Sequence, residues 1–186
     1  MAKLTIVGDP ASPAALPRLA FEVADLLNQW SQVDVALEVP SGGHVFVAHP
    51  DAEQRAAVMA GIDTDRLATL VHPTATVSRS AQLGRNIMIG AQAVVMMDAI
   101  VGDGVNASSL SSIEHDNYIG RFTFFGTGAM LCGRVITGDY AFIGGGAIVQ
   151  PGVTIGERCT VGTGAVVIRD TGPGSTVVGN PARPIG

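Results

Sequence analysis

The chain is poor in charged residues. Only 15% of its 186 residues are Asp, Glu, Lys or Arg, and the formal net charge is -5 at pH 7. Binding to nucleic acid or to an anionic membrane depends on clustered Lys and Arg, so we expect neither as the main partner. Because 47% of the residues are hydrophobic, the scarcity of charge also indicates that much of the surface is buried between subunits.

Long apolar segments are lacking as well. No apolar run approaches the roughly 18 residues that span a bilayer. The apolar stretch near the N-terminus begins at Leu4 and is followed closely by Asp9 and Pro10, which makes it too short for a signal peptide. These two observations predict a cytoplasmic protein without a membrane-inserted segment.

Cysteine is scarce, with Cys132 and Cys159 as the two examples. Cys159 falls on a small, inward position of the repeat described next. A packed thiol is therefore favoured over a disulfide or a metal site.

A six-residue repeat runs from Val71 to about Ile168. Every sixth residue is large and apolar, with two exceptions, Ala107 and Thr137. The next residue is often glycine, and the residue four after the apolar one is small or β-branched. The apolar column is Val71, Val77, Leu83, Ile89, Val95, Val101, Ala107, Ile113, Ile119, Phe125, Leu131, Thr137, Ile143, Val149, Ile155, Val161 and Val167.

A period of six is neither the 3.6 of an α-helix nor the 2 of a two-sided strand. It indicates a parallel β-helix, in which the apolar residue points into a narrow prism, the small residue packs beside it and glycine allows the backbone to turn at the corner. Each coil is stabilised by its neighbours. We predict a mainly β fold with this β-helix over residues 71–168, followed by a turn and tail over residues 169–186.

The first 70 residues lack the repeat and alternate between strand and helix patterns. This alternation predicts a small α/β unit over residues 1–70, built on a mostly parallel sheet. The predicted strands are residues 4–8, 33–39, 44–48 and 67–71, and the predicted helices are residues 18–30, after Pro17, and 51–60, after Pro50.

The turn after the first predicted strand is where a dinucleotide-binding fold would place a Gly-rich phosphate loop. The loop over residues 8–14 holds one glycine, Gly8. Asp9 would repel phosphate, and two prolines remove N–H donors. These residues therefore favour an ordinary loop. For Glu38, at the end of the second predicted strand, a solvated carboxylate is favoured over a contact with a ribose hydroxyl.

The densest cluster of titratable groups in the repeat is Glu114-His115-Asp116, at the one place where both the glycine and the small position of a hexad are replaced. His115 comes two residues after inward-pointing Ile113, so it should lie at a corner that solvent can reach. A neutral imidazole beside a carboxylate is a good general base near neutral pH. A surface histidine on a solvated coil is the alternative that these residues leave open.

Stacking places further residues near one another. Three hexads make one triangular coil, so residues 18 apart should lie one above the other, about 4.8 Å away. Gly133 therefore lies one coil after His115, where an unobstructed backbone N–H could stabilise an oxyanion. In the same way Thr127, Gly145 and Thr163 form one column, and the run of glycines over residues 144–146 gives it a smooth surface for an extended ligand.

Nearly the whole chain resembles the family of sialic acid O-acetyltransferases and nucleotide-aminosugar N-acetyltransferases. The resemblance is carried by the small α/β unit, the hexapeptide repeat, the Ser-Ser-Ile-Glu-His-Asp segment at 111–116 and the Gly-Asn-Pro-Ala-Arg ending at 179–183. It implies that the β-helix is left-handed, that the first unit is a Rossmann-like domain for the acceptor, and that a homotrimer places active sites between neighbouring prisms.

The resemblance also implies roles for individual residues. His115 matches the general base of the family, Asp116 the carboxylate that raises its basicity, and Gly133 the backbone donor to the thioester oxyanion. The positions that contact acetyl-CoA in the family are matched by Phe124, Gly145 and Thr163, while Arg183 falls near the phosphate end of CoA. No metal is needed.

The chain departs from the family pattern in its first loop. Relatives that bind nucleotide sugars carry a glycine-rich loop with a Ser-Gly-His-like run after the first strand, where this chain has Asp9-Pro10-Ala11-Ser12-Pro13. The resemblance thus implies an acetyl-CoA-dependent N-acetyltransferase for a nucleotide-linked aminosugar. O-acetylation of a sugar or sialic acid by the same machinery stays open as an alternative.

Two further classes are weighed. A zinc-dependent carbonic anhydrase on this fold needs three converging histidines, but the β-helix offers only His72 and His115, and their separation is not a whole number of coils. A non-catalytic trimeric scaffold that has lost acceptor binding is the alternative that the altered first loop keeps open.

Overall fold

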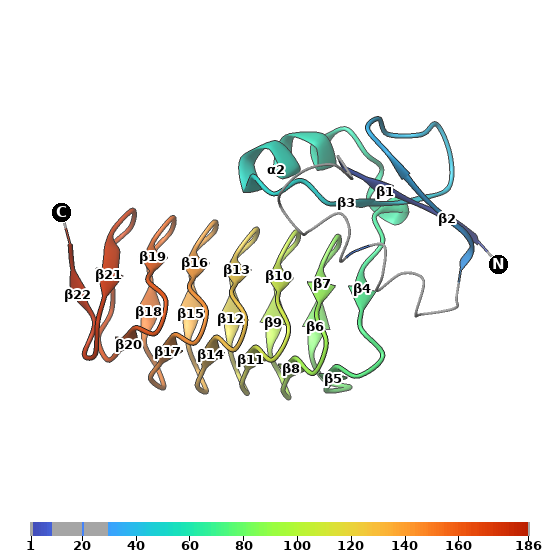
Figure 1. The fold of residues 1–186 in the computed structure, drawn as a ribbon. Helices are drawn as coiled ribbons and strands as arrows, with labels where there is room; N and C mark the ends of the chain where they lie inside the picture. The colour runs from blue at the N-terminus through green and yellow to red at the C-terminus, as the bar shows by residue number, and fades with distance from the viewer. Residues whose placement is uncertain (1, 9–19, 21–29, 186) are drawn as a thin grey trace.

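A computed structural model describes residues 2–8, 20 and 30–185 of the chain (Figure 1). Most of the chain is one long stack of short strands. A small sheet lies beside the first coils of that stack, and a helix lies beside the coils that follow. The C-terminus lies at the far end of the stack, away from the small sheet.

The small sheet has three parallel strands in the order β2-β1-β3. β1 is Ala2–Val7, β2 is Trp30–Ala36 and β3 is His44–Val47. The helix α2, Ala52–Ala60, follows with Asp51 as its N-cap, because the Asp51 carboxylate accepts from the Gln54 N–H at 2.8 Å. A 3-10 turn, η1 (Thr64–Arg66), leads from α2 into the stack.

The sequence predicts this region in outline and misses some details. The second strand begins three residues earlier than expected, so Trp30 opens β2 and does not end a helix; the rest of that predicted helix lies outside the described residues, apart from Ala20. Glu38 is exposed just past β2, and the loop over residues 9–14 is not described. Within the described residues, α2 is the helix whose bounds are given for this region, and the Rossmann-like character predicted for residues 1–70 is not confirmed.

The stack is a parallel β-solenoid of the left-handed type, made of two-residue strands on three sheets. Paired residues are one coil apart in every sheet, as in Ile113↔Leu131 and Ile119↔Thr137. The hexad therefore predicts every strand of the repeat. These strands are β4 Leu70–Val71, β5 Thr76–Val77, β6 Gln82–Leu83, β7 Met88–Ile89, β8 Val94–Val95, β9 Ile100–Val101, β10 Asn106–Ala107, β11 Ser112–Ile113, β12 Tyr118–Ile119, β13 Phe124–Phe125, β14 Met130–Leu131, β15 Ile136–Thr137, β16 Phe142–Ile143, β17 Ile148–Val149, β18 Thr154–Ile155, β19 Thr160–Val161 and β20 Val166–Val167.

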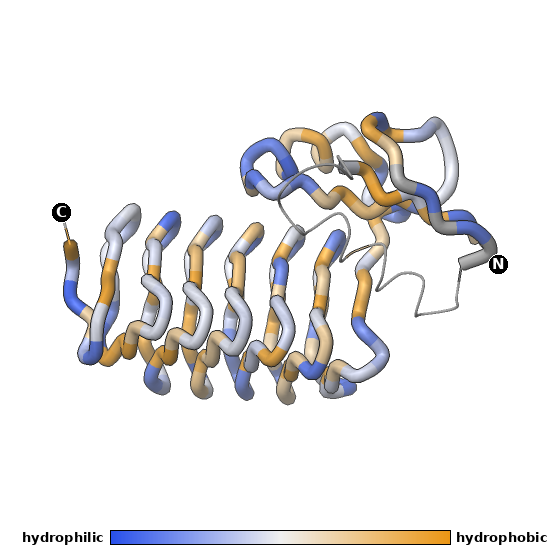
Figure 2. The backbone as a smooth tube through the Cα atoms, in the orientation of Figure 1, coloured by the Kyte–Doolittle hydropathy of each residue, from blue (hydrophilic) through white to orange (hydrophobic). Residues whose placement is uncertain are grey.

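Three sheets enclose the core. The strand orders are β4-β7-β10-β13-β16-β19, β5-β8-β11-β14-β17-β20 and β6-β9-β12-β15-β18, and the first sheet continues with two further strands described below. The second residue of each strand points inward, and from β7 to β20 all of these residues are buried. Figure 2 shows the apolar residues recurring along each coil. Cys159 is fully buried and both cysteines are free, which confirms the packed thiol for Cys159.

The last strands close the stack. β21, Thr176–Val178, still pairs in parallel with β19, whereas β22, Arg183–Pro184, pairs antiparallel with β21. The repeat therefore ends in a hairpin.

The glycines of the hexad have a different role from the one predicted. The corner residues with positive φ are mostly not glycine, as at Asn86 (φ 54) and Phe122 (φ 58). Gly120 does not have a positive φ, but a Cβ added there would lie 2.4 Å from the backbone carbon of Gly138 in the next coil. The prediction that these glycines allow the corner backbone is wrong; they allow adjacent coils to approach closely.

The small sheet and α2 are held against one corner column of the solenoid. Asn86 is buried, and its side-chain amide accepts from the Val47 N–H at 2.7 Å and donates to the Val47 carbonyl at 3.0 Å. The buried Arg55 of α2 donates to the Gly104 carbonyl at 3.3 Å, and its guanidinium lies 5.8 Å from the Phe122 ring centroid. Burial lowers the pKa of Arg55 to about 10. Farther along, Arg158 forms an ion pair with Glu53 of α2.

Replacing Asn86 with Gly tests this attachment. Glycine accepts the positive φ of residue 86 without strain but leaves the buried N–H and carbonyl of Val47 without their partners. We expect the free energy of unfolding to fall by about 2–4 kcal/mol, and amide exchange in β3 to accelerate more than in the distal coils. Exchange that accelerates equally throughout the solenoid would contradict a local role for Asn86.

Candidate active site

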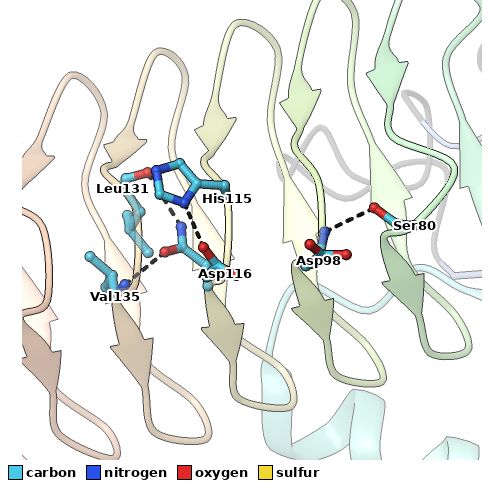
Figure 3. Close-up of polar contacts among 7 residues, drawn as sticks. Ser80, Asp98, His115, Asp116, Leu131 and Val135 are labelled. Carbon is cyan, nitrogen blue, oxygen red and sulfur yellow. Dashed lines mark hydrogen bonds and ion pairs between the residues drawn. The ribbon is translucent and has the colours of Figure 1, made fainter.

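His115 and Asp116 lie at the corner that follows β11. The positive φ of Asp116, 59°, turns its carboxylate back toward the preceding residue, and Asp116 Oδ2 lies 2.7 Å from His115 Nδ1 (Figure 3). An ionised carboxylate only accepts, so Nδ1 carries the proton and Nε2 of the neutral ring keeps a free lone pair. Both side chains are about half exposed, at 43% and 52%. This geometry is compatible with a general base that solvent and substrate can reach.

Gly133 lies directly against the His115 ring. A Cβ at residue 133 would be 2.4 Å from His115 Nε2 and 2.5 Å from Cε1, so only glycine leaves room for the ring in this place. The Gly133 carbonyl accepts from the Gly152 N–H at 3.1 Å, while the Gly133 N–H donates to no acceptor in the described part of the chain. The stacking predicted for His115 and Gly133 is confirmed, and the free N–H is compatible with binding an oxyanion.

Other polar groups surround the histidine. Ser112 Oγ donates to Glu114 Oε1 at 2.6 Å, on the sheet side of the corner. Cys132, one coil above Glu114, is partly exposed. The sequence singles out Glu114 as part of the cluster but does not identify Ser112 as its partner, since a serine beside a hexad carries no distinguishing signal.

The residues matched to acetyl-CoA lie on other parts of the prism. Phe124 faces outward on β13 and stacks on Phe142, with ring centroids 5.1 Å apart. Gly145 and Thr163 belong to the corner between the β13 sheet and the β14 sheet. Their column is confirmed by the bond from the Gly146 N–H to the Thr127 carbonyl and by the bond from the Gly164 N–H to the Gly145 carbonyl, both 2.9 Å.

One chain therefore does not bring all the predicted site residues together. His115, Asp116 and Gly133 share the edge between the β11 and β12 sheets, whereas Gly145 and Thr163 lie on a different edge. Arg183 is exposed on β22 at the end of the solenoid. It lines a cavity of about 270 Å³ together with Arg169, Asp170, Thr171, Ser175 and Val177, among others.

The described residues hold no group of three or more His, Cys, Asp or Glu side chains that could bind a metal ion. His72 lies near the first coil, where its Nδ1 is 2.8 Å from Thr74 Oγ1. Within residues 2–8, 20 and 30–185, no helix has the length and apolar character needed to cross a membrane.

Comparisons with known proteins agree with this fold. A model of the bacterial transferase hexapeptide family, described as six repeats, matches residues 134–169. No curated protein sequence matches the chain. The hexapeptide repeat and the fold make the chain similar to known hexapeptide-repeat acyltransferases.

Two solved structures are similar over almost the whole chain. The acetyltransferase domain of PglB from Neisseria gonorrhoeae FA1090, in complex with acetyl coenzyme A, has a TM-score of 0.88 and 27% identity, covering 98% of each chain. PerB from Caulobacter crescentus, in complex with CoA and GDP-perosamine, has a TM-score of 0.86 and 27% identity, covering 99% of this chain and 97% of PerB. WeeI from Acinetobacter baumannii AYE shares the fold, with a TM-score of 0.81 and 21% identity.

Proposed function

We propose that the chain transfers the acetyl group of acetyl-CoA to the amino group of a nucleotide-linked aminosugar. The observation that carries this proposal is the His115–Asp116 pair packed against Gly133, because it combines a base, a group that orients the base and a free N–H donor within one corner. The PglB domain with acetyl coenzyme A and PerB with CoA and GDP-perosamine support the choice of donor and acceptor.

The reaction has two steps at this corner. As the acceptor nitrogen attacks the thioester carbon, His115 Nε2 takes a proton from the amine, and Asp116 stabilises the imidazolium that forms. The carbonyl oxygen becomes an oxyanion, which the Gly133 N–H stabilises. When the tetrahedral intermediate collapses, the C–S bond breaks and the CoA thiolate leaves, taking the proton from His115.

We propose a homotrimer with active sites between subunits. Two observations support it. Gly145 and Thr163, which we assign to the binding of acetyl-CoA, lie on a different edge from His115. In addition, the two sheets that meet at the His115 edge carry exposed apolar side chains. These are 38–54% exposed in the single chain and comprise Ile100, Tyr118, Ile136, Met130 and Ile148. Packing against a second prism would bury these side chains and bring a second edge beside His115.

Each part of the chain has a separate role in this proposal. Residues 1–70 bind the acceptor, and residues 71–168 bind the donor and carry out the transfer. Phe124, Gly145 and Thr163 contact acetyl-CoA. In the segment 169–186, Arg183 binds the phosphate end of CoA.

The test is thiol release from acetyl-CoA with a panel of nucleotide-linked amino and hydroxy sugars. We expect release that depends on an amino sugar and saturates with it. Release that requires a hydroxy sugar would replace the N-transfer with O-transfer. Saturable CoA binding without release for any acceptor would contradict the proposal and favour a non-catalytic trimer.

A further inference from the structure

Asn117 is a polar side chain inside the prism, in a column along one edge that otherwise holds small apolar residues. The same position of the other coils holds Ala81, Ala99, Val135 and Val153. Asn117 is only 1% exposed, so its amide needs partners within the protein.

Both ends of the amide are bonded to the next coil. Asn117 Oδ1 accepts from the Val135 N–H at 2.7 Å, and Asn117 Nδ2 donates to the Leu131 carbonyl at 3.3 Å. In Figure 3 these two bonds end at the labelled Leu131 and Val135. Leu131 and Val135 lie two residues before and two residues after Gly133. The Asn117 side chain therefore holds both ends of the corner that carries Gly133.

Other corners of this edge are closed differently. In three of them the N–H of the last corner residue donates to the carbonyl of the first corner residue. The Ala81 N–H donates to the Ser78 carbonyl at 3.1 Å. The N–H groups of Ala99 and Val153 donate to the carbonyls of Met96 and Gln150, respectively, both at 3.4 Å. At the Gly133 corner the N–H of Val135 instead donates to Asn117. The Arg134 N–H also donates to the His115 carbonyl at 3.0 Å. The coil that carries His115 therefore fixes the shape of the corner above it.

We infer that Asn117 is a positioning residue for the oxyanion donor, acting through the Leu131–Val135 corner to keep the Gly133 N–H in place beside the His115 ring. The inference rests on the proposed function, in which Gly133 stabilises the oxyanion. Asn117 does not touch the reacting atoms. Its effect comes from geometry, because a donor displaced by about 1 Å loses much of its stabilisation of the transition state.

The experiment compares Asn117→Val with Thr123→Val in the full-length protein. Valine already occupies the equivalent position at residues 135 and 153. Thr123 is a matched control: it is fully buried and donates to the Gly120 carbonyl at 2.8 Å. Its contacts with the next coil are to Thr137 Oγ1 at 3.3 Å and the Gly138 carbonyl at 3.4 Å, which come after the Gly133 corner has ended at Val135. Two quantities are measured in each variant: kcat and KM for acetyl transfer, and the amide signals of Gly133 and Val135 in ¹⁵N-labelled protein with their hydrogen-exchange rates.

In Asn117→Val we expect Val135 exchange to accelerate, the Gly133 signal to shift and kcat to fall at least about tenfold, with KM for both substrates within about twofold. Thr123→Val should lower thermal stability to a similar degree without these changes. If Asn117→Val does not fold, Asn117→Ala, the residue found at positions 81 and 99, takes its place.

An unchanged Gly133 signal, or a kcat equal to that of Thr123→Val, would overturn the inference. The amide measurements are independent of turnover. If the wild-type protein transfers no acetyl group, the proposed function fails, while the Gly133 and Val135 signals still decide whether Asn117 sets the geometry of the corner.

Discussion

Replacing His115 with Ala is expected to lower kcat for acetyl transfer by about a hundred- to ten-thousandfold, the usual contribution of a general base. The variant removes the imidazole that accepts the proton of the amine and leaves Asp116 without its partner. The pair is about half exposed and contributes little to stability, so the thermal unfolding midpoint should stay close to that of the wild type. The measurement is acceptor-dependent thiol release under saturating acetyl-CoA.

His72→Ala is the matched control, because His72 is the second histidine of the repeat and lies near the first coil, bonded to Thr74. It should leave kcat unchanged. A folded His115→Ala protein with nearly normal turnover would show that the base is another group, and the proposed mechanism would have to be abandoned.

Replacing Gly133 with Ala is expected to have an effect of similar size through a different cause. The added methyl group would lie 2.4 Å from His115 Nε2, so either the ring or the corner must move. Moving the ring displaces the base, and moving the corner displaces the N–H donor. We expect kcat to fall by about a hundred- to a thousandfold, the loss typical of removing one oxyanion donor.

Steady-state kinetics and the NMR signals of the His115 ring together check this prediction. Gly61→Ala serves as the control, since a Cβ there would meet nothing closer than the Val58 carbonyl oxygen at 3.7 Å. If Gly133→Ala kept the wild-type kcat, the close packing of ring and glycine would have no part in catalysis.

Most of the fold could be predicted from the sequence, because a hexad repeat fixes both the strand positions and the register. Ile113 and Leu131 pair as the period requires, and this register brings Gly133 to His115. The glycine positions were recognised, but their role was not. Whether glycine serves a positive φ or a close approach depends on the neighbouring coil, and the pattern of one hexad does not contain that information.

One feature of the candidate site could not be predicted from the sequence. Asn117 looks like a simple exception in a column of small residues, because its role depends on its hydrogen bonds to Leu131 and Val135 in another coil. That His115 and Gly145 lie on different edges, in contrast, follows from the 18-residue period, because these two residues are not a whole number of coils apart. In the N-terminal region, helical spacing alone places Trp30 at the end of a helix. Pairing with β1 instead makes Trp30 the first residue of β2.

The constant register of the solenoid has a consequence for insertions and deletions. Because each strand from β4 to β20 pairs with the strand 18 residues away, removing one whole coil beyond Gly152 would shorten the protein by about 4.8 Å and leave the remaining side chains of the repeat on their own faces. Removing a single hexad would instead rotate the rest of the stack by one face and carry Thr163 to another edge. Natural length variation in such a protein should therefore occur in steps of a full coil, with loops at the corners absorbing anything smaller.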